Sequence, residues 1–211
     1  HTLMQEKRLF LLDAYALIYR SYYAFMKNPR INSKGLNTSC IMGFCNTLNE
    51  ILTKEKPTHI GVAFDHGKTF RHEAFPAYKA QREETPEDIK LSVPIIKNIL
   101  DAYHIPILQV DGFEADDVIG TLATKAGEKG VETYMLTPDK DYGQLVKDNV
   151  YMYRPQHGGG YEKLGTKEIE EKYIHELMAY KIEGLIVLSN TISSEELASY
   201  KLPVVTIERE C

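Results

Sequence analysis

Short apolar runs alternate with longer amphipathic segments along most of the chain. The runs predict buried strands at residues 8–12, 59–64, 105–110, 132–136 and 149–153. Apolar residues at helical spacing predict helices at residues 14–25, 40–54, 91–103, 114–129 and 167–180. Strands that alternate with helices favour an α/β fold, in which a central, mainly parallel sheet has helices on both faces.

Three further elements are predicted near the C-terminus. Strands are expected at residues 185–189 and 204–207, with a helix at 194–200 between them. Both strands are apolar on both faces, so we expect them to join or extend the central sheet. An uncovered edge of that sheet could pair with a second copy of the chain, which would give a homodimer.

Composition and charge suit a globular protein of the cytoplasm. Hydrophobic residues make up 43% of the chain and charged residues 26%, and no run of about 18 apolar residues predicts a membrane span. The three cysteines have no metal-ligand spacing, and the N-terminus has no apolar signal core. The net charge of -5 argues mildly against a nucleic-acid partner, unless many of the acids are ligands for cations.

Acidic residues stand where the predicted strands end. Asp13 follows the first strand and Asp65 the second, and further acids follow the third and fourth strands. The carboxyl ends of parallel strands meet at one edge of a sheet, so these side chains should converge there. The acids of the third and fourth strand ends are Glu114, Asp116 and Asp117, which open a helix, and Asp139 and Asp141.

Such a group of carboxylates predicts a site for divalent cations. Like charges raise each other's pKa, so cations are needed to keep several close carboxylates ionised. Oxygen ligands favour Mg²⁺ or Mn²⁺, and two such ions about 4 Å apart would stabilise an in-line displacement at a phosphodiester. Other interpretations stay open: the acids at 114–117 suit a helix N-terminus, Asp65 could cap a turn, and Asp139 and Asp141 could form one.

Basic residues occur where a nucleic-acid substrate would need them. Arg20 lies seven residues beyond Asp13, two turns along the predicted helix. Residues 66–90 are mixed in charge, without a core face, and contain basic residues interleaved with aromatic ones. Basic side chains bind phosphates and aromatic rings stack on bases, although a mobile, solvated loop is the alternative. The basic residues of this segment include Arg71, Lys79 and Arg82.

Several of these motifs resemble the 5′-nuclease domain of bacterial DNA polymerase I, from about Lys7 to Ile174. The resemblance implies a PIN-like α/β core, two carboxylate-held metal ions and hydrolysis of DNA at 5′ ends or flaps. It matches Asp13, Asp65, Glu114, Asp116, Asp117, Asp139 and Asp141 to metal ligands or their neighbours, and Arg20, Arg71, Lys79 and Arg82 to phosphate contacts. Asp13, Asp65, Lys79 and Arg82 are expected to serve catalysis, with no small-molecule cofactor. Its motifs are Phe10-Leu11-Leu12-Asp13, Ala63-Phe64-Asp65, Thr69-Phe70-Arg71-His72-Glu73, Tyr78-Lys79-Ala80-Gln81-Arg82, Gly112-Phe113-Glu114-Ala115-Asp116-Asp117 and Thr137-Pro138-Asp139-Lys140-Asp141.

The chain departs from that family beyond residue 175. The family continues with a Gly-Asp-x-x-Asp segment, which supplies two further metal ligands, and with a helical duplex-binding motif. Residues 176–211 contain neither and are similar to part of the sugar-binding core of LacI-type repressors. We therefore expect two domains, a 5′-nuclease-like core at 1–175 and an α/β extension at 176–211. Nuclease activity would be weakened, and an inactive chimeric or structural domain is the alternative.

Overall fold

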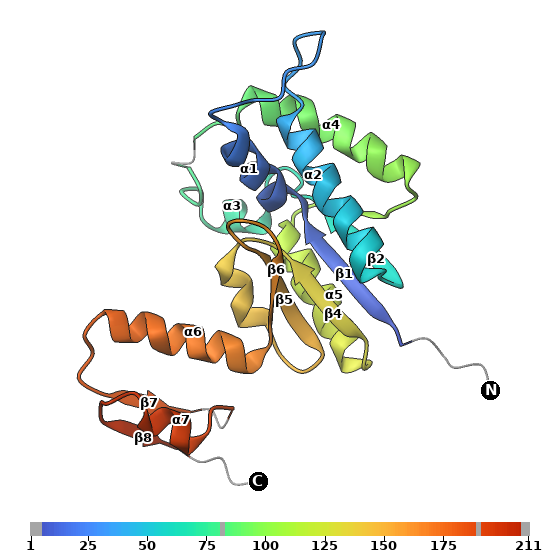
Figure 1. Cartoon of the computed structure of the whole chain (residues 1–211). Coiled ribbons are helices and arrows are strands. Elements are labelled where there is room, and N and C mark those ends of the chain that lie inside the picture. The colour runs from blue at the N-terminus through green and yellow to red at the C-terminus, as the bar shows by residue number, and fades with distance from the viewer. Residues whose placement is uncertain (1–5, 81–82, 189–190, 208–211) are drawn as a thin grey trace, which may run out of the picture.

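The computed structural model describes residues 6–80, 83–188 and 191–207 and is built on a six-stranded sheet (Figure 1). The strands stand in the order β3-β2-β1-β4-β5-β6. All neighbours are parallel except β5 and β6, which form an antiparallel hairpin. The mainly parallel sheet predicted from the sequence is confirmed. The strands are β1 Arg8–Asp13, β2 His59–Ala63, β3 Ile107–Leu108, β4 Glu132–Leu136, β5 Val150–Pro155 and β6 Tyr161–Leu164.

Helices cover both faces of this sheet (Figure 1), and the side chains of β1 show how. Phe10 and Leu12 enter a core shared with α1, α2 and α4, whereas Leu11 enters the opposite core with Ile119 of α5. Successive side chains of a strand face opposite sides, so an apolar run is buried twice. No helix in the described ranges is long and apolar enough to cross a membrane. The helices are α1 Ala14–Phe25, α2 Ser39–Glu50, which continues as a π-helical turn at Ile51–Glu55, α4 Glu87–Ala102 and α5 Ala115–Glu128.

Strands β1, β2 and β4 run in register toward one edge of the sheet. Asp13 pairs with Ala63 of β2, and Leu12 pairs with Leu136 of β4. The chain turns into α1 directly after β1, and Asp13 caps this helix by accepting a hydrogen bond from the backbone N–H of Ala16 at 3.3 Å. A cap satisfies one of the free N–H groups of the first turn. The strand end and the helix start thus hold Asp13 at this edge.

The segment at residues 66–90 has more regular structure than the sequence predicted. It contains the short helix α3, Phe70–Ala74, and α4 begins at Glu87 with a fully buried Ile89. Acids favour the first turn of a helix, so the charged residues before the predicted start belong to α4. The third strand is shorter than predicted, because only Ile107–Leu108 pair with β2.

The last two strands do not join the central sheet, so that prediction is wrong. β7 (Leu185–Val187) and β8 (Val204–Thr206) form a parallel two-stranded sheet of their own. The reason is the helix α6 (Thr166–Ala179), whose 14 residues carry the chain roughly 21 Å away from β6 (Figure 1). Apolarity on both faces indicated a buried strand but not the sheet to which it belongs.

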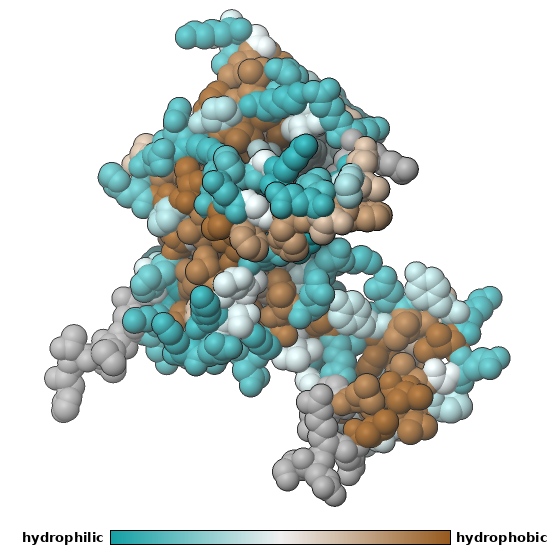
Figure 2. Space-filling model, turned by 180° about the vertical axis from the view of Figure 1, so that it is seen from behind, coloured by the Kyte–Doolittle hydropathy of each residue, from teal (hydrophilic) through white to brown (hydrophobic). Residues whose placement is uncertain are grey.

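The C-terminal strands have a small core and an exposed apolar face. Val187 and Leu197 of the helix α7 (Ser194–Ala198) pack with Ile174 of α6. Ile186 and Val205, which are paired in register, are 68% and 59% exposed, and hydrophobic residues gather on this part of the surface (Figure 2). Because α6 contributes to this core and, at its other end, packs against the central one, a domain boundary at residue 175 stays a prediction.

Candidate functional site

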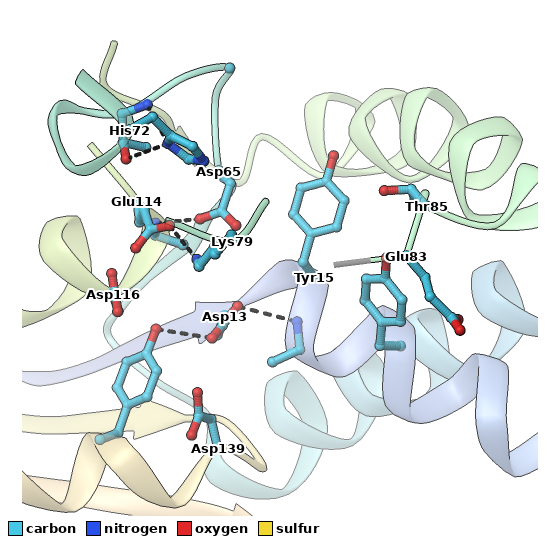
Figure 3. A pocket seen from close by; sticks show the side chains of 16 residues that line it. Asp13, Tyr15, Asp65, His72, Lys79, Glu83, Thr85, Glu114, Asp116 and Asp139 are labelled. Carbon is cyan, nitrogen blue, oxygen red and sulfur yellow. Dashed lines mark hydrogen bonds and ion pairs between the residues drawn. The ribbon is translucent and has the colours of Figure 1, made fainter. Parts of the chain in front are cut away.

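A cavity of about 560 Å³ lies at the carboxyl edge of the sheet (Figure 3). Acids from four strand ends line it, and two of them are buried: Asp13 is 8% exposed and Glu114 5%. The other acids of the lining are Asp65, Asp116 and Asp139, which follow strand ends, and Glu83, which comes from the segment at residues 66–90. The fold therefore brings together carboxylates that lie up to 126 positions apart in the chain, as parallel strands ending at one edge require.

Asp13 is the most enclosed acid on the strand side of the cavity. The hydroxyl of Tyr142 donates to Asp13 Oδ2 at 2.9 Å, and the hydroxyl of Thr137 donates to the same oxygen at 3.4 Å. Burial raises the pKa of Asp13 to about 6, and the nearby carboxylates of Asp65 and Asp139 act in the same direction. A cation bound beside this carboxyl would lower its pKa and further stabilise its charge.

The start of α5 supplies the second group of carboxylates. Asp65 accepts a hydrogen bond from the backbone N–H of Ala115 at 2.6 Å, which joins the end of β2 to the start of α5. Carboxylate oxygens of Glu114, Asp116 and Asp117 all lie within 4.8 Å of one another. Burial raises the pKa of Asp116, and the charges of Asp117 and Glu114 raise it further. These acids open a helix and also form a cluster, and the cation site predicted for them stays a prediction.

Basic side chains from residues 66–80 lie against this cluster. Arg71 forms two hydrogen bonds with Asp117, at 2.6 and 2.7 Å, and a third with Glu114 at 3.2 Å. Lys79 forms an ion pair with Glu114, which also accepts a bond from the hydroxyl of Tyr78 at 3.0 Å. Burial alone would raise the pKa of Glu114, but Lys79 and Tyr78 hold it below its usual value. Arg71 likewise lowers the pKa of Asp117. These ion pairs and hydrogen bonds therefore hold residues 66–80 against the start of α5.

The donor set of the cavity fits a hard divalent cation. All the acids in the lining offer carboxylate oxygens, the ligand type that such cations prefer. The raised pKa values of Asp13 and Asp116 show that their charges lack full compensation from the protein. A cation between these side chains would supply it.

Some predicted site residues lie outside the cavity. The guanidinium of Arg20 donates to the backbone oxygen of Gln156 at 2.9 Å and lines a separate cavity of about 210 Å³ beside Gly159 and Gly160. Seven residues of α1 carry Arg20 roughly 10 Å beyond Asp13, and this distance separates the two. Of the remaining predicted residues, Asp141 is exposed and absent from the lining, and Arg82 lies outside the described residues. Asp117 and Arg71 are also absent from the lining and pair with each other.

No pattern in the sequence predicted a role at the site for Tyr142 or for Thr137. Tyr142 belongs to a 3-10 helix, Lys140–Leu145, that Asp139 caps by accepting a bond from the N–H of Asp141 at 3.0 Å. This turn buries the Tyr142 ring to 3% exposure and directs its hydroxyl toward Asp13. The short turn has no apolar period, so nothing in the sequence marked this residue.

Comparisons with known proteins place most of the chain in one family. Residues 8–174 match the family described as 5′-3′ exonuclease, N-terminal resolvase-like domain. The chain is 40% identical over 171 residues to DNA polymerase I of Bacillus caldotenax, which covers 80% of this chain and 19% of that protein. It is also 40% identical over 163 residues to the 5′-3′ exonuclease of Aquifex aeolicus, covering 77% of this chain and 54% of that protein. The chain therefore spans about a fifth of the polymerase and about half of the exonuclease.

Solved structures share the fold. The T5 D15 protein co-crystallised with metal ions matches with a TM-score of 0.59 at 19% identity, over 80% of this chain and 61% of that one. The bacteriophage T5 D15 flap endonuclease, in a complex with DNA and metal ions, matches with a TM-score of 0.54 at 18% identity and the same coverage. The family match ends at residue 174, and the resemblance of residues 176–211 to a repressor stays a prediction.

Proposed function

We infer the activity of this chain from its family, because the chain belongs to the 5′-3′ exonucleases through their N-terminal resolvase-like domain. We propose that it is a divalent-metal-dependent nuclease that hydrolyses DNA phosphodiesters at 5′ ends or flaps. The cavity lined by six carboxylates, five of which follow strand ends of the sheet, supports this proposal most directly. A protein of the same fold has been crystallised with DNA and metal ions, which agrees with it.

We propose Mg²⁺ or Mn²⁺ as the ion, since carboxylate oxygens suit both. Asp13, Asp65, Glu114 and Asp116 would hold one ion, and Asp139, with Asp141 beside it, would contribute to a second. When bound, such ions stabilise the attacking and leaving oxygens of a phosphodiester displacement. Both oxygens of Asp117 accept bonds from Arg71, so its role here is to hold that guanidinium over the cluster.

The basic side chains of residues 66–80 would bind the phosphate to be cleaved. Arg71 and Lys79 already lie at the carboxylate cluster. A cation that binds Glu114 would let Lys79 turn toward a phosphate, while Asp117 keeps Arg71 beside the site. Arg20, in its separate cavity, would contact a phosphate further along the strand. Such contacts position a strand without reading its sequence, which suits recognition of an end or a flap. The corresponding role of Arg82 remains a prediction.

We expect these 211 residues to cleave more slowly than a family member that has the Gly-Asp-x-x-Asp segment. Residues 176–211 contain no aspartate at all, so they offer no such pair to a second ion. Losing one ion of a pair removes several kcal/mol of transition-state stabilisation, and each ~1.4 kcal/mol is a tenfold loss in rate. Pairing of two copies through a sheet edge also stays a prediction.

The test is cleavage of a labelled 5′-flap DNA in Mg²⁺ and in Mn²⁺. We expect cleavage that disappears in Asp13→Ala and in Asp65→Ala but persists in Asp101→Ala, which removes an exposed acid at the end of α4. Cleavage that survives equally in all three variants would show that another site, or a contaminant, is responsible. Tight Mn²⁺ binding without any cleavage would favour an inactive domain.

A further inference from the structure

One oxygen of Asp13 is in contact with a buried hydroxyl. Tyr142 is 3% exposed, and its hydroxyl lies 2.9 Å from Asp13 Oδ2, across 129 positions of sequence. The bond is drawn as one of the dashed lines at Asp13 in Figure 3. Buried hydroxyls normally find a partner, but this one has found a carboxylate that faces the cavity.

The position of the Tyr142 ring is set by the core rather than by the cavity. The ring packs with Leu11, Ile119 and Met135 in the core between the sheet and α5. Its backbone lies in the 3-10 helix that Asp139 caps. A ring held in this way has little freedom to turn, so its hydroxyl is presented to Asp13 in one direction.

The carboxylate of Asp13 is thereby held at both oxygens. Oδ1 accepts from the N–H of Ala16 at 3.3 Å, and Oδ2 accepts from Tyr142 and, at 3.4 Å, from Thr137. A carboxylate has about four lone-pair sites, so these bonds leave acceptor capacity for a cation in the cavity.

We propose that Tyr142 is a positioning residue for Asp13: its hydroxyl fixes the carboxylate in the orientation that binds the divalent ion. The inference rests on the proposed function, since it gives Tyr142 a role toward that ion. Groups that hydrogen-bond to metal ligands fix the ligand orientation, and their loss typically costs about 10- to 100-fold in metal affinity or activity. We expect a loss at the lower end of this range, because Ala16 and Thr137 still bind Asp13.

The test is Mn²⁺ binding by the full chain without DNA, measured by titration. Tyr142→Phe keeps the ring and removes only the hydroxyl, and we expect the Kd for Mn²⁺ to rise about tenfold. The matched control is Tyr153→Phe, which removes a hydroxyl that donates to Glu55 on the other face of the sheet and should leave the Kd unchanged. Tyr142→Met, which also lacks a hydroxyl, should show the same loss, and melting curves in EDTA verify that each variant is folded.

A double variant separates positioning from a general effect on the fold. In an Asp13→Asn background, adding Tyr142→Phe should change the Kd by less than about twofold, because the carboxylate on which Tyr142 acts is gone. The inference is overturned if folded Tyr142→Phe binds Mn²⁺ as tightly as the parent, or if the tenfold loss persists in the Asp13→Asn background. A parent chain that does not bind Mn²⁺ would instead refute the proposed function itself.

Discussion

Asp13 should make the metal-free protein less stable at neutral pH than a variant without its charge. Its carboxyl is 8% exposed and lies beside other carboxylates of the cavity. Asp13→Asn keeps the size of the side chain and an acceptor oxygen for the N–H of Ala16, but it cannot ionise. In EDTA the substitution should therefore stabilise the fold, although it removes a proposed metal ligand.

The pKa of Asp13 gives the size and the sign of this effect. Burial raises the pKa from 3.8 to about 6 in the folded chain, so the folded state binds the proton more tightly than the unfolded state. The carboxyl therefore costs no stability well below its unfolded pKa, costs more as the pH rises through the interval between the two values, and costs a constant amount above it. A shift of this size corresponds to roughly 3 kcal/mol of lost stability at neutral pH.

Urea unfolding followed by circular dichroism measures the difference, since the chain has no tryptophan to report by fluorescence. We expect the unfolding free energy of Asp13→Asn to exceed that of the parent by up to about 3 kcal/mol near pH 8. Near pH 4 this difference should largely disappear. Asp101→Asn, at an exposed position, should show neither effect. Added Mg²⁺ should stabilise the parent more than the variant and so narrow the gap. A variant that is equally destabilised at both pH values would refute the reasoning.

Three further predictions concern contacts around the site. Gly43→Ala should lower the unfolding free energy by about 1–3 kcal/mol in urea, because its Cβ would meet Ser21 Cβ at 2.6 Å between α1 and α2. Asp65→Ala should lower the melting temperature in EDTA more than Asp65→Asn, since only alanine leaves the N–H of Ala115 without its acceptor, at a cost of about 2 kcal/mol. Arg71→Met should speed limited proteolysis within residues 66–80, because Arg71 fastens them to α5, and unchanged cleavage would contradict this.

For residues 66–80, the sequence predicted the kind of side chains at the site but not the partners that they contact. The pattern indicated basic and aromatic residues near phosphate, and Arg71 and Lys79 do lie at the cavity edge of the sheet. Their partners in the structure are Glu114 and Asp117, at separations of 35 to 46 positions. An ion pair of this kind depends on how the segment folds back onto α5, and the local spacing of apolar residues does not predict that.

The sequence by itself determined the five parallel strands of the central sheet, its two helical layers and the edge at which the acids meet, but not the antiparallel strand β6. Each follows from a simple rule. The spacing of apolar residues predicts each helix or strand, and the carboxyl ends of parallel strands lie at one edge of a sheet. Only the tertiary structure decided that Tyr142 reaches Asp13, that Arg20 lies apart from it, and that β7 and β8 pair with each other. These outcomes depend on packing between segments that lie far apart in the sequence. The length of α6 or the direction of one turn determines which segments meet, and hydrophobicity alone does not determine this.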